Sequence, residues 1–213
     1  MKKTTRGPGA VVAMVVLGSV ALQAQHALSK SVTAVTAEIE TNQTTFLADG
    51  NTLQRAVGSR FYRDSKGRTR LEQGPIVTIS DPGQGLTIVL DLEKRTARKL
   101  RGPSQRTPVN QNAQPSLSVT QRASLGVRLI EGAEAVGKEF IAIIPAGSPI
   151  GNSKPLEQVT EVWHSEALQL PLLVIVTDPV AGKLVTRYTN IRQIEPQASL
   201  FEIPSGFQES SGQ

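Results

Sequence analysis

The sequence predicts a mainly β fold made of antiparallel strands, and three observations support this prediction. Apolar and polar residues alternate along most runs, as in 33–40 and 156–165, and alternate residues of a strand lie on opposite faces. Gly-, Pro- and Asp-rich segments separate these runs and are typical of turns. Amphipathic helix patterns are nearly absent, and the one candidate is a single turn at 165–168.

The first half of the chain is expected to form a meander that begins with a strand at 33–40. The next two strands, 53–62 and 68–72, flank an Asp-Ser-Lys-Gly turn and predict a β-hairpin with a strongly basic exposed face. Further strands are expected at 75–80, 86–91 and 96–100.

The second half resumes the strand pattern, with a hairpin expected at 123–132 and 137–145. Later strands are expected at 156–165, 168–177 and 184–194. Both halves contain the motif Asp-Pro-x-x-Gly, at 81–85 and at 178–182. Asp caps such a turn, Pro presets φ, and Gly adopts the positive φ that reverses the chain, so both motifs predict turns.

The N-terminus is typical of an export signal. Three basic residues within 1–6 precede an apolar run at 10–22, and small residues follow. The run is shorter than the roughly 20 apolar residues that a membrane span needs, although a retained anchor is the alternative. We expect residues 1–24 to be a signal peptide cleaved after Ala24, or else after Ala27. The product is then periplasmic or secreted.

The remainder is expected to be a single β-rich domain at 25–207. Residues 101–118 contain three prolines, three glutamines and two asparagines. Such a segment buries too little apolar surface to offset its ordering entropy, which predicts a mobile loop or linker. Residues 208–213 are polar and predict a disordered tail.

Composition excludes several classes of site. The 213 residues contain no cysteine, which rules out disulfides, thiolate metal sites and cysteine nucleophiles. The two histidines, His26 and His164, lie far apart and match no metal or triad motif. His164 lies near Glu166, but a histidine without a placed nucleophile is typical of a solvated surface. We therefore expect no metal, no cofactor and no catalytic residues.

The charge distribution leaves two interpretations open. Loss of Lys2, Lys3 and Arg6 with the signal peptide lowers the net charge from +5 to +2, which argues against a nucleic-acid partner. Basic residues concentrate at 55–72 and 91–106. They form either a basic face for an anionic lipid, glycan or acidic partner, or strands that pair with acidic neighbours in the sheet.

Trp163 is the single tryptophan, and leucines follow it at 168, 170 and 172. It is either an anchor of the core or a wall of an apolar ligand cavity. The same two interpretations apply to Phe61 and Phe140.

The C-terminal half resembles a known family across about 157–207. Its motifs are Glu161-Val162-Trp163, Leu170-Pro171-Leu172, Asp178-Pro179, Thr189-Asn190-Ile191, Leu200-Phe201 and Pro204-Ser205-Gly206-Phe207. Together they resemble the outer-membrane-lipoprotein-sorting (LolA/LolB-like) domains and the RseB/MucB-like sensors. The whole chain also resembles a group of uncharacterised secreted bacterial proteins. The resemblance implies a curved antiparallel sheet or half-open β-barrel with few short helices, which holds acyl chains.

These observations predict a non-enzymatic periplasmic module that binds a lipid or lipidated protein and contacts a membrane only transiently. Acyl chains are expected to lie on the concave face against Trp163, Leu170, Leu172, Phe61 and Phe140. An anionic head group is expected to meet Arg60, Arg68 and Arg70. The alternative is an envelope sensor or protein-interaction module without a lipid ligand, which binds through its sheet edge or 101–118.

Overall fold

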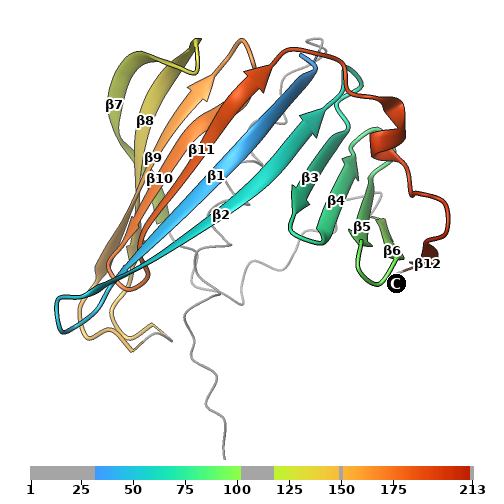
Figure 1. The fold of residues 1–213 in the computed structure, drawn as a ribbon. Coiled ribbons are helices and arrows are strands. Elements are labelled where there is room, and N and C mark those ends of the chain that lie inside the picture. The colour runs from blue at the N-terminus through green and yellow to red at the C-terminus, as the bar shows by residue number, and fades with distance from the viewer. Residues whose placement is uncertain (1–31, 102–117, 149–150, 212–213) are drawn as a thin grey trace, which may run out of the picture.

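Twelve strands and one short helix make up the described part of the chain, which in this computed structural model comprises residues 32–101, 118–148 and 151–211 (Figure 1). The predicted signal peptide and nearly all of 101–118 lie outside the described residues. The elements are β1 (Val35–Phe46), β2 (Thr52–Arg63), β3 (Thr69–Gln73), β4 (Ile76–Asp81), β5 (Leu86–Asp91), β6 (Thr96–Arg101), β7 (Ser118–Ile130), β8 (Ala133–Ile144), β9 (Leu156–Ser165), β10 (Leu170–Asp178), β11 (Gly182–Arg192), the 3-10 helix η3 (Ala198–Phe201) and β12 (Gln208–Ser211).

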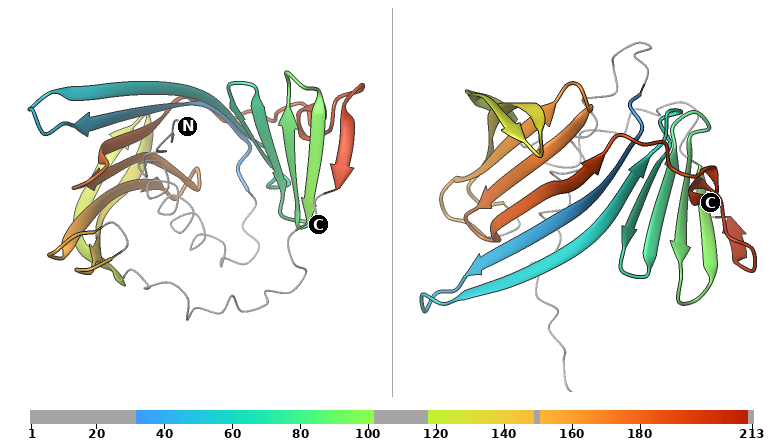
Figure 2. Two further views of the ribbon diagram at one scale, coloured as in Figure 1. Left: turned by 90° about the horizontal axis from the view of Figure 1, so that it is seen from below. Right: turned by 45° about the horizontal axis from the view of Figure 1, so that its top comes forward.

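All twelve strands belong to one sheet, in the order β12-β6-β5-β4-β3-β2-β1-β11-β10-β9-β8-β7. Adjacent strands are antiparallel, except that β12 runs parallel to β6. The two halves of the sequence meet where β1 pairs with β11, so they form one continuous sheet. This sheet curves strongly but stays open at its edges (Figure 2), which confirms the predicted mainly β fold with a curved antiparallel sheet.

Apolar side chains gather in two main clusters. On β1, Val35 and Ala37 are buried, as the period-two pattern predicts. They join the first cluster with Ile130, Ala135, Trp163, Leu168, Leu170, Leu172 and Leu173. The second cluster lies on β4, β5 and β6 beneath η3, and comprises Val77, Ile79, Ile88, Leu90, Ala97 and Phe201.

A polar contact ties the β7–β8 turn to β11, although β9 and β10 lie between these elements in the sheet. The Asn190 backbone N–H donates to the carboxylate of Glu131 at 3.3 Å. The hairpin of β7 and β8 therefore curls back toward the centre of the sheet, as Figure 1 shows.

Both Asp-Pro turns have the predicted chemistry. Asp81 accepts a hydrogen bond from the Gln84 N–H at 3.1 Å. Asp178 accepts from the N–H groups of Val180 and Ala181, each at 2.7 Å. Gly182 has a φ of +91°, and a Cβ added to it would lie 2.1 Å from the Thr44 carbonyl oxygen, so no larger residue fits there.

Two expectations need correction. The candidate helical segment at 165–168 forms no helix: Ser165 ends β9, and 166–168 belong to the turn that joins β9 to β10. The predicted disordered tail at 208–213 is wrong for Gln208–Ser211, which pairs with β6. The Gln208 N–H donates to the Arg95 carbonyl at 2.9 Å, and Lys99 forms an ion pair with Glu209 at 2.5 Å. Backbone pairing does not require apolar side chains, so composition did not indicate this strand.

Candidate functional site

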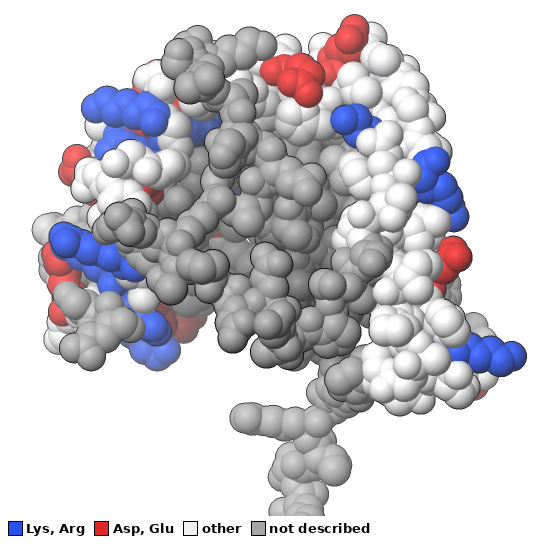
Figure 3. Space-filling view, turned by 180° about the vertical axis from the view of Figure 1, so that it is seen from behind, with Lys and Arg blue, Asp and Glu red and all other residues white. Residues whose placement is uncertain are grey.

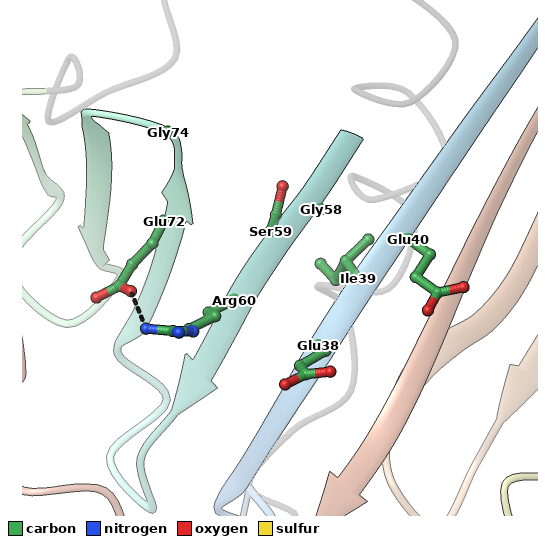
Figure 4. Close-up of a pocket in the computed structure, with 8 residues that line it drawn as sticks. All are labelled: Glu38, Ile39, Glu40, Gly58, Ser59, Arg60, Glu72 and Gly74. Carbon is green, nitrogen blue, oxygen red and sulfur yellow. Dashed lines mark ion pairs between the residues drawn. The ribbon is translucent and has the colours of Figure 1, made fainter. Parts of the chain in front are cut away.

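The sheet forks between β2 and β3. All twelve residues of β2 pair with β1, but only Arg60–Arg63 pair with β3. Along 52–59, no described strand pairs with the outer edge of β2. A groove of about 410 Å³ lies at this fork (Figure 4), lined by Glu38, Ile39, Glu40, Gly58, Ser59, Arg60, Glu72 and Gly74.

The short length of β3 produces the fork. β3 ends at Gln73, and the turn at Gly74 and Pro75 leads directly into β4. Gly74 has a φ of +56°, a conformation that glycine adopts without strain. β3 therefore has five residues beside the twelve of β2, and Gly58, Ser59 and Arg60 of β2 line the groove where β3 ends.

Acidic side chains outnumber basic ones in the groove. Glu38 and Glu72 lie in one row on either side of Arg60, according to the pairing of β1, β2 and β3. Arg60 and Glu72 point toward each other across 4.0 Å (Figure 4). Glu40 forms no ion pair with any described residue. No group of three or more His, Asp or Glu residues suited to a metal ion occurs in the part of the chain that the structure describes.

The predicted basic hairpin forms, but its basic side chains differ in exposure. The Arg60 side chain is 68% exposed and lines the groove. By contrast, Arg68 pairs with buried Asp64 at 2.7 Å and lies over the Phe201 ring at 4.7 Å. Arg70 is buried, pairs with Glu72 at 2.7 Å and donates to the Leu200 carbonyl at 2.8 Å. An exposed basic face is thus wrong for these two residues, because acids and a carbonyl of this chain compensate them.

The apolar residues singled out from the sequence separate into two places. Trp163, Leu170 and Leu172 are buried together in the first cluster, and Phe61 packs against that cluster while meeting the Tyr188 ring edge-on at 5.6 Å. Phe140 lies instead against a small cluster of Val162, Val174 and Val176. None of the five lines the groove at the fork.

Trp163 is held from two sides. The Arg128 guanidinium lies 3.8 Å from its ring centre, which is a cation–π contact. Gly137, directly opposite Trp163 on β8, leaves room for the ring, because a Cβ there would lie 2.7 Å from a ring carbon. Tight packing of this kind is typical of a core position.

Arg63 is a buried charge that sequence reasoning missed. Its guanidinium donates to the carbonyl oxygens of Thr33, Leu168 and Gln169. Burial lowers the pKa of Arg63. Burial also raises the pKa of nearby Tyr188 to about 12, although Arg63 opposes that rise. The partners of Arg63 lie 30 to 106 residues away, so no local pattern could indicate them.

His164 has no arrangement for acid–base chemistry in the described residues. Its Nδ1 lies 3.6 Å from a carboxylate oxygen of Glu166, whose side chain is 81% exposed. Burial lowers the pKa of His164, and Glu166 only partly opposes that effect. The histidine is therefore predominantly neutral at pH 7.

Charges of both signs are interspersed on the face seen from behind, where Lys and Arg side chains lie among Asp and Glu (Figure 3). The ion pair of Arg60 with Glu72 joins neighbouring strands, as the second interpretation of the basic segments expects. The ion pairs of Arg68 and Arg70 instead lie within the β2–β3 turn and within β3. No helix among the described residues is long and apolar enough to cross a membrane.

Sequence reasoning identified Arg60 but missed the other residues of the groove. Gly74-Pro75 was available as a turn signal that ends β3. The groove also includes residues 38–40 of β1, whose place beside β2 depends on strand pairing that no local pattern encodes.

Comparison with solved structures shows two similar folds. An uncharacterized conserved protein from Thermus thermophilus superposes with a TM-score of 0.50 at 10% identity, covering 94% of this chain and 99% of that chain. A chain from the Pseudomonas aeruginosa MucA/MucB complex superposes with a TM-score of 0.51 at 13% identity. This match covers 92% of our chain but only 62% of the other.

A LolA superfamily protein, NE2245 from Nitrosomonas europaea, also matches, with a TM-score of 0.29, 10% identity and coverage of 86% and 96%. No protein-family model and no curated protein matches the sequence. The match to the chain from the MucA/MucB complex confirms the RseB/MucB-like fold that the sequence resemblance implies.

Proposed function

We propose that this chain is an exported, non-enzymatic binding module of the bacterial envelope, and that its ligand is a segment of another protein. The observation that supports a protein ligand is the edge of β2 at 52–59, with which no described strand pairs, beside an open, polar groove. An unpaired strand edge offers backbone donors and acceptors that a polypeptide can satisfy and an acyl chain cannot.

The placement of the predicted lipid-binding residues also supports this proposal. Trp163, Leu170 and Leu172 are buried in a packed cluster, and Arg68 and Arg70 are occupied by partners within the chain. The neighbouring fold is that of a chain from a MucA/MucB complex, which is an assembly of two proteins. The signal peptide predicted at residues 1–24 supports a periplasmic or secreted location.

Site-specific photo-crosslinking in a bacterial envelope tests the proposal. A photoreactive amino acid replaces Ser59 in the groove, and a matched control replaces Leu129, which is 75% exposed on β7. We expect one polypeptide, identified by mass spectrometry, to crosslink at Ser59 and not at Leu129. That polypeptide should then form a complex with this protein when both are purified. Absence of any polypeptide crosslink at Ser59 would contradict a protein ligand.

A lipid or lipidated protein is the second candidate ligand. Phe140 and Leu184 are only partly buried and flank Val162, Val174 and Val176, so strands β8 to β11 present an apolar surface. Native mass spectrometry of the exported protein, followed by solvent extraction, tests this candidate. A reproducible adduct of lipid mass that Phe140→Gln weakens would support it. A mass equal to that of the ligand-free protein would exclude a lipid ligand.

A further inference from the structure

We propose that an extended segment of a partner protein adds to the free edge of β2 as a further strand, with a lysine or arginine directed toward Glu40. This inference rests on the proposed protein-binding function, and it specifies the conformation and charge of the ligand.

The backbone of β2 supplies the docking edge. Along 52–59, alternate residues direct their N–H and C=O groups away from β1, which leaves about four residues with outward backbone groups. These residues are exposed or half-buried, so water solvates the outward groups when no strand is added. An added strand replaces that water with ladder hydrogen bonds, as in other cases of β-strand addition.

The groove has room for a backbone at this edge. A strand lies about 4.8 Å from its neighbour in a sheet. Gly58 on β2 and Gly74 at the end of β3 face the groove, and a Cβ added to either residue would meet no heavy atom within 4 Å. The groove is therefore open on both sides of the position that the new strand would occupy.

The pairing register of β1, β2 and β3 indicates the charge of the partner residue that would lie opposite Gly58. Glu38, Arg60 and Glu72 fill one row across β1, β2 and β3. The next row on the same face contains Gly58, Glu40 and Arg187, which lies opposite Glu40 on β11. No described residue pairs with Gly58 on its other side. A partner residue opposite Gly58 would lie about 9.6 Å from Glu40, two strand spacings, with only a glycine between them. A lysine or arginine side chain spans that gap and meets a carboxylate that forms no ion pair with any described residue, Arg187 included.

The opposite face of the edge favours apolar side chains. Val57 is half-buried and neighbours the pair formed by Ser59 and buried Ile39. Because successive residues of a strand point to opposite faces, the partner segment alternates basic or polar residues with apolar ones.

Selection from a phage-displayed library of random octapeptides tests the inference on the exported full-length mature protein. We expect enriched peptides to alternate apolar and polar residues around one lysine or arginine. On binding, these peptides should slow hydrogen exchange at the backbone amides of 52–59 and leave the edge strand β7 unchanged. Enrichment of acidic peptides, protection only outside 52–59, or no enrichment would each overturn the inference.

Two pairs of measurements isolate the contact with Glu40. An enriched peptide is compared with the same peptide in which glutamine replaces its lysine or arginine. We expect the charged peptide to bind about threefold more tightly, the effect of one solvent-exposed ion pair. Glu40→Gln should reduce the ratio of the two peptide affinities to about one, because it removes the carboxylate. Gly58→Val should have the same effect, because its side chain fills the space between the partner residue and Glu40. Ala56→Val is the matched control, because Ala56 is exposed on the same face but lies opposite Asn42.

The outcomes separate the two proposals. A preserved ratio in Glu40→Gln would overturn the assigned charge contact. Peptides that bind elsewhere, together with a polypeptide crosslink at Ser59, would overturn strand addition but leave the protein-binding function standing. Loss of the Ser59 crosslink itself would remove the proposed function.

Discussion

The guanidinium of Arg63 donates a hydrogen bond to the carbonyl oxygen of Gln169 at 3.0 Å, 106 residues further along the chain. The same side chain donates to the Thr33 carbonyl at 2.9 and 3.1 Å, and also to the Leu168 carbonyl. β2 and β10 are separated in the sheet by β1 and β11. The contact therefore joins the end of β2 to the β9–β10 turn across two intervening strands.

Replacement of Arg63 by methionine should destabilise the fold. The variant keeps most of the side-chain volume but leaves three carbonyl oxygens without their donor, which costs about 2–4 kcal/mol of the free energy of unfolding. Urea denaturation measures the change. Arg55→Met is the control, because Arg55 is exposed on the same strand, and it should change stability by less than about 0.5 kcal/mol. Equal urea midpoints for the two variants would show that Arg63 does not hold the turn.

Gly137→Ala should disturb the packing of Trp163. The added Cβ would lie 2.7 Å from the indole ring and 2.8 Å from the Leu125 Cβ, so ring or backbone must shift. Overpacking of this kind costs about 1–3 kcal/mol. Trp163 is the single tryptophan, so its fluorescence emission should move to longer wavelength as the ring becomes solvated. Gly58→Ala adds the same methyl group in open space and should leave the emission unchanged.

Replacement of Asn190 by glycine should destabilise the fold less than replacement by alanine. Its φ is +51°, next to the irregularity at which β1 and β11 shift register. Its side-chain amide donates to Glu38 at 2.7 Å. Asn190→Ala loses that bond and retains the unfavourable φ, which together cost about 1–2 kcal/mol in thermal or urea unfolding. Asn190→Gly loses the same bond but relieves the φ, so it should be the more stable of the two variants. The reverse order would mean that backbone conformation does not govern this position.

Local chemistry explains which parts of the fold could be predicted. The Asp81 and Asp178 turns depend on residues within four positions, and the structure forms them as expected. The alternation that buries Val35 and Ala37 is equally local. These signals specify strands and hairpins but not the order in which distant strands pair, which is why the β1–β11 pairing came only from the structure.

The candidate site was harder to predict because its residues depend on long-range geometry. Arg68 and Arg70 were expected to be exposed on the basis of a basic pattern. Asp64 and Glu72, which compensate them, lie in the same hairpin, whereas the Leu200 carbonyl that also holds Arg70 lies 130 residues away. The Gly74-Pro75 turn signal marks the end of the short β3, but no local pattern indicates that residues 38–40 of β1 line the groove beside it.

Stability should fall as the pH drops through the titration range of His164. Its pKa in the folded protein is lowered from the ordinary value of 6.5, chiefly by burial, so the unfolded chain takes up the proton at a higher pH than the folded chain. The unfolded state then binds more protons below about pH 6.5, and the free energy of unfolding decreases with falling pH in that range.

His164→Gln removes this titration and keeps a polar side chain at the half-buried position. Urea midpoints measured at several values between about pH 5 and pH 8 should decline less steeply on the acidic side for the variant than for the parent protein. At pH 8 His164 and the glutamine that replaces it are both neutral, so a difference between the two urea midpoints at that pH reports packing alone. Parallel curves over the whole range would mean that His164 titrates alike in the folded and unfolded chain, contrary to the effect of its burial.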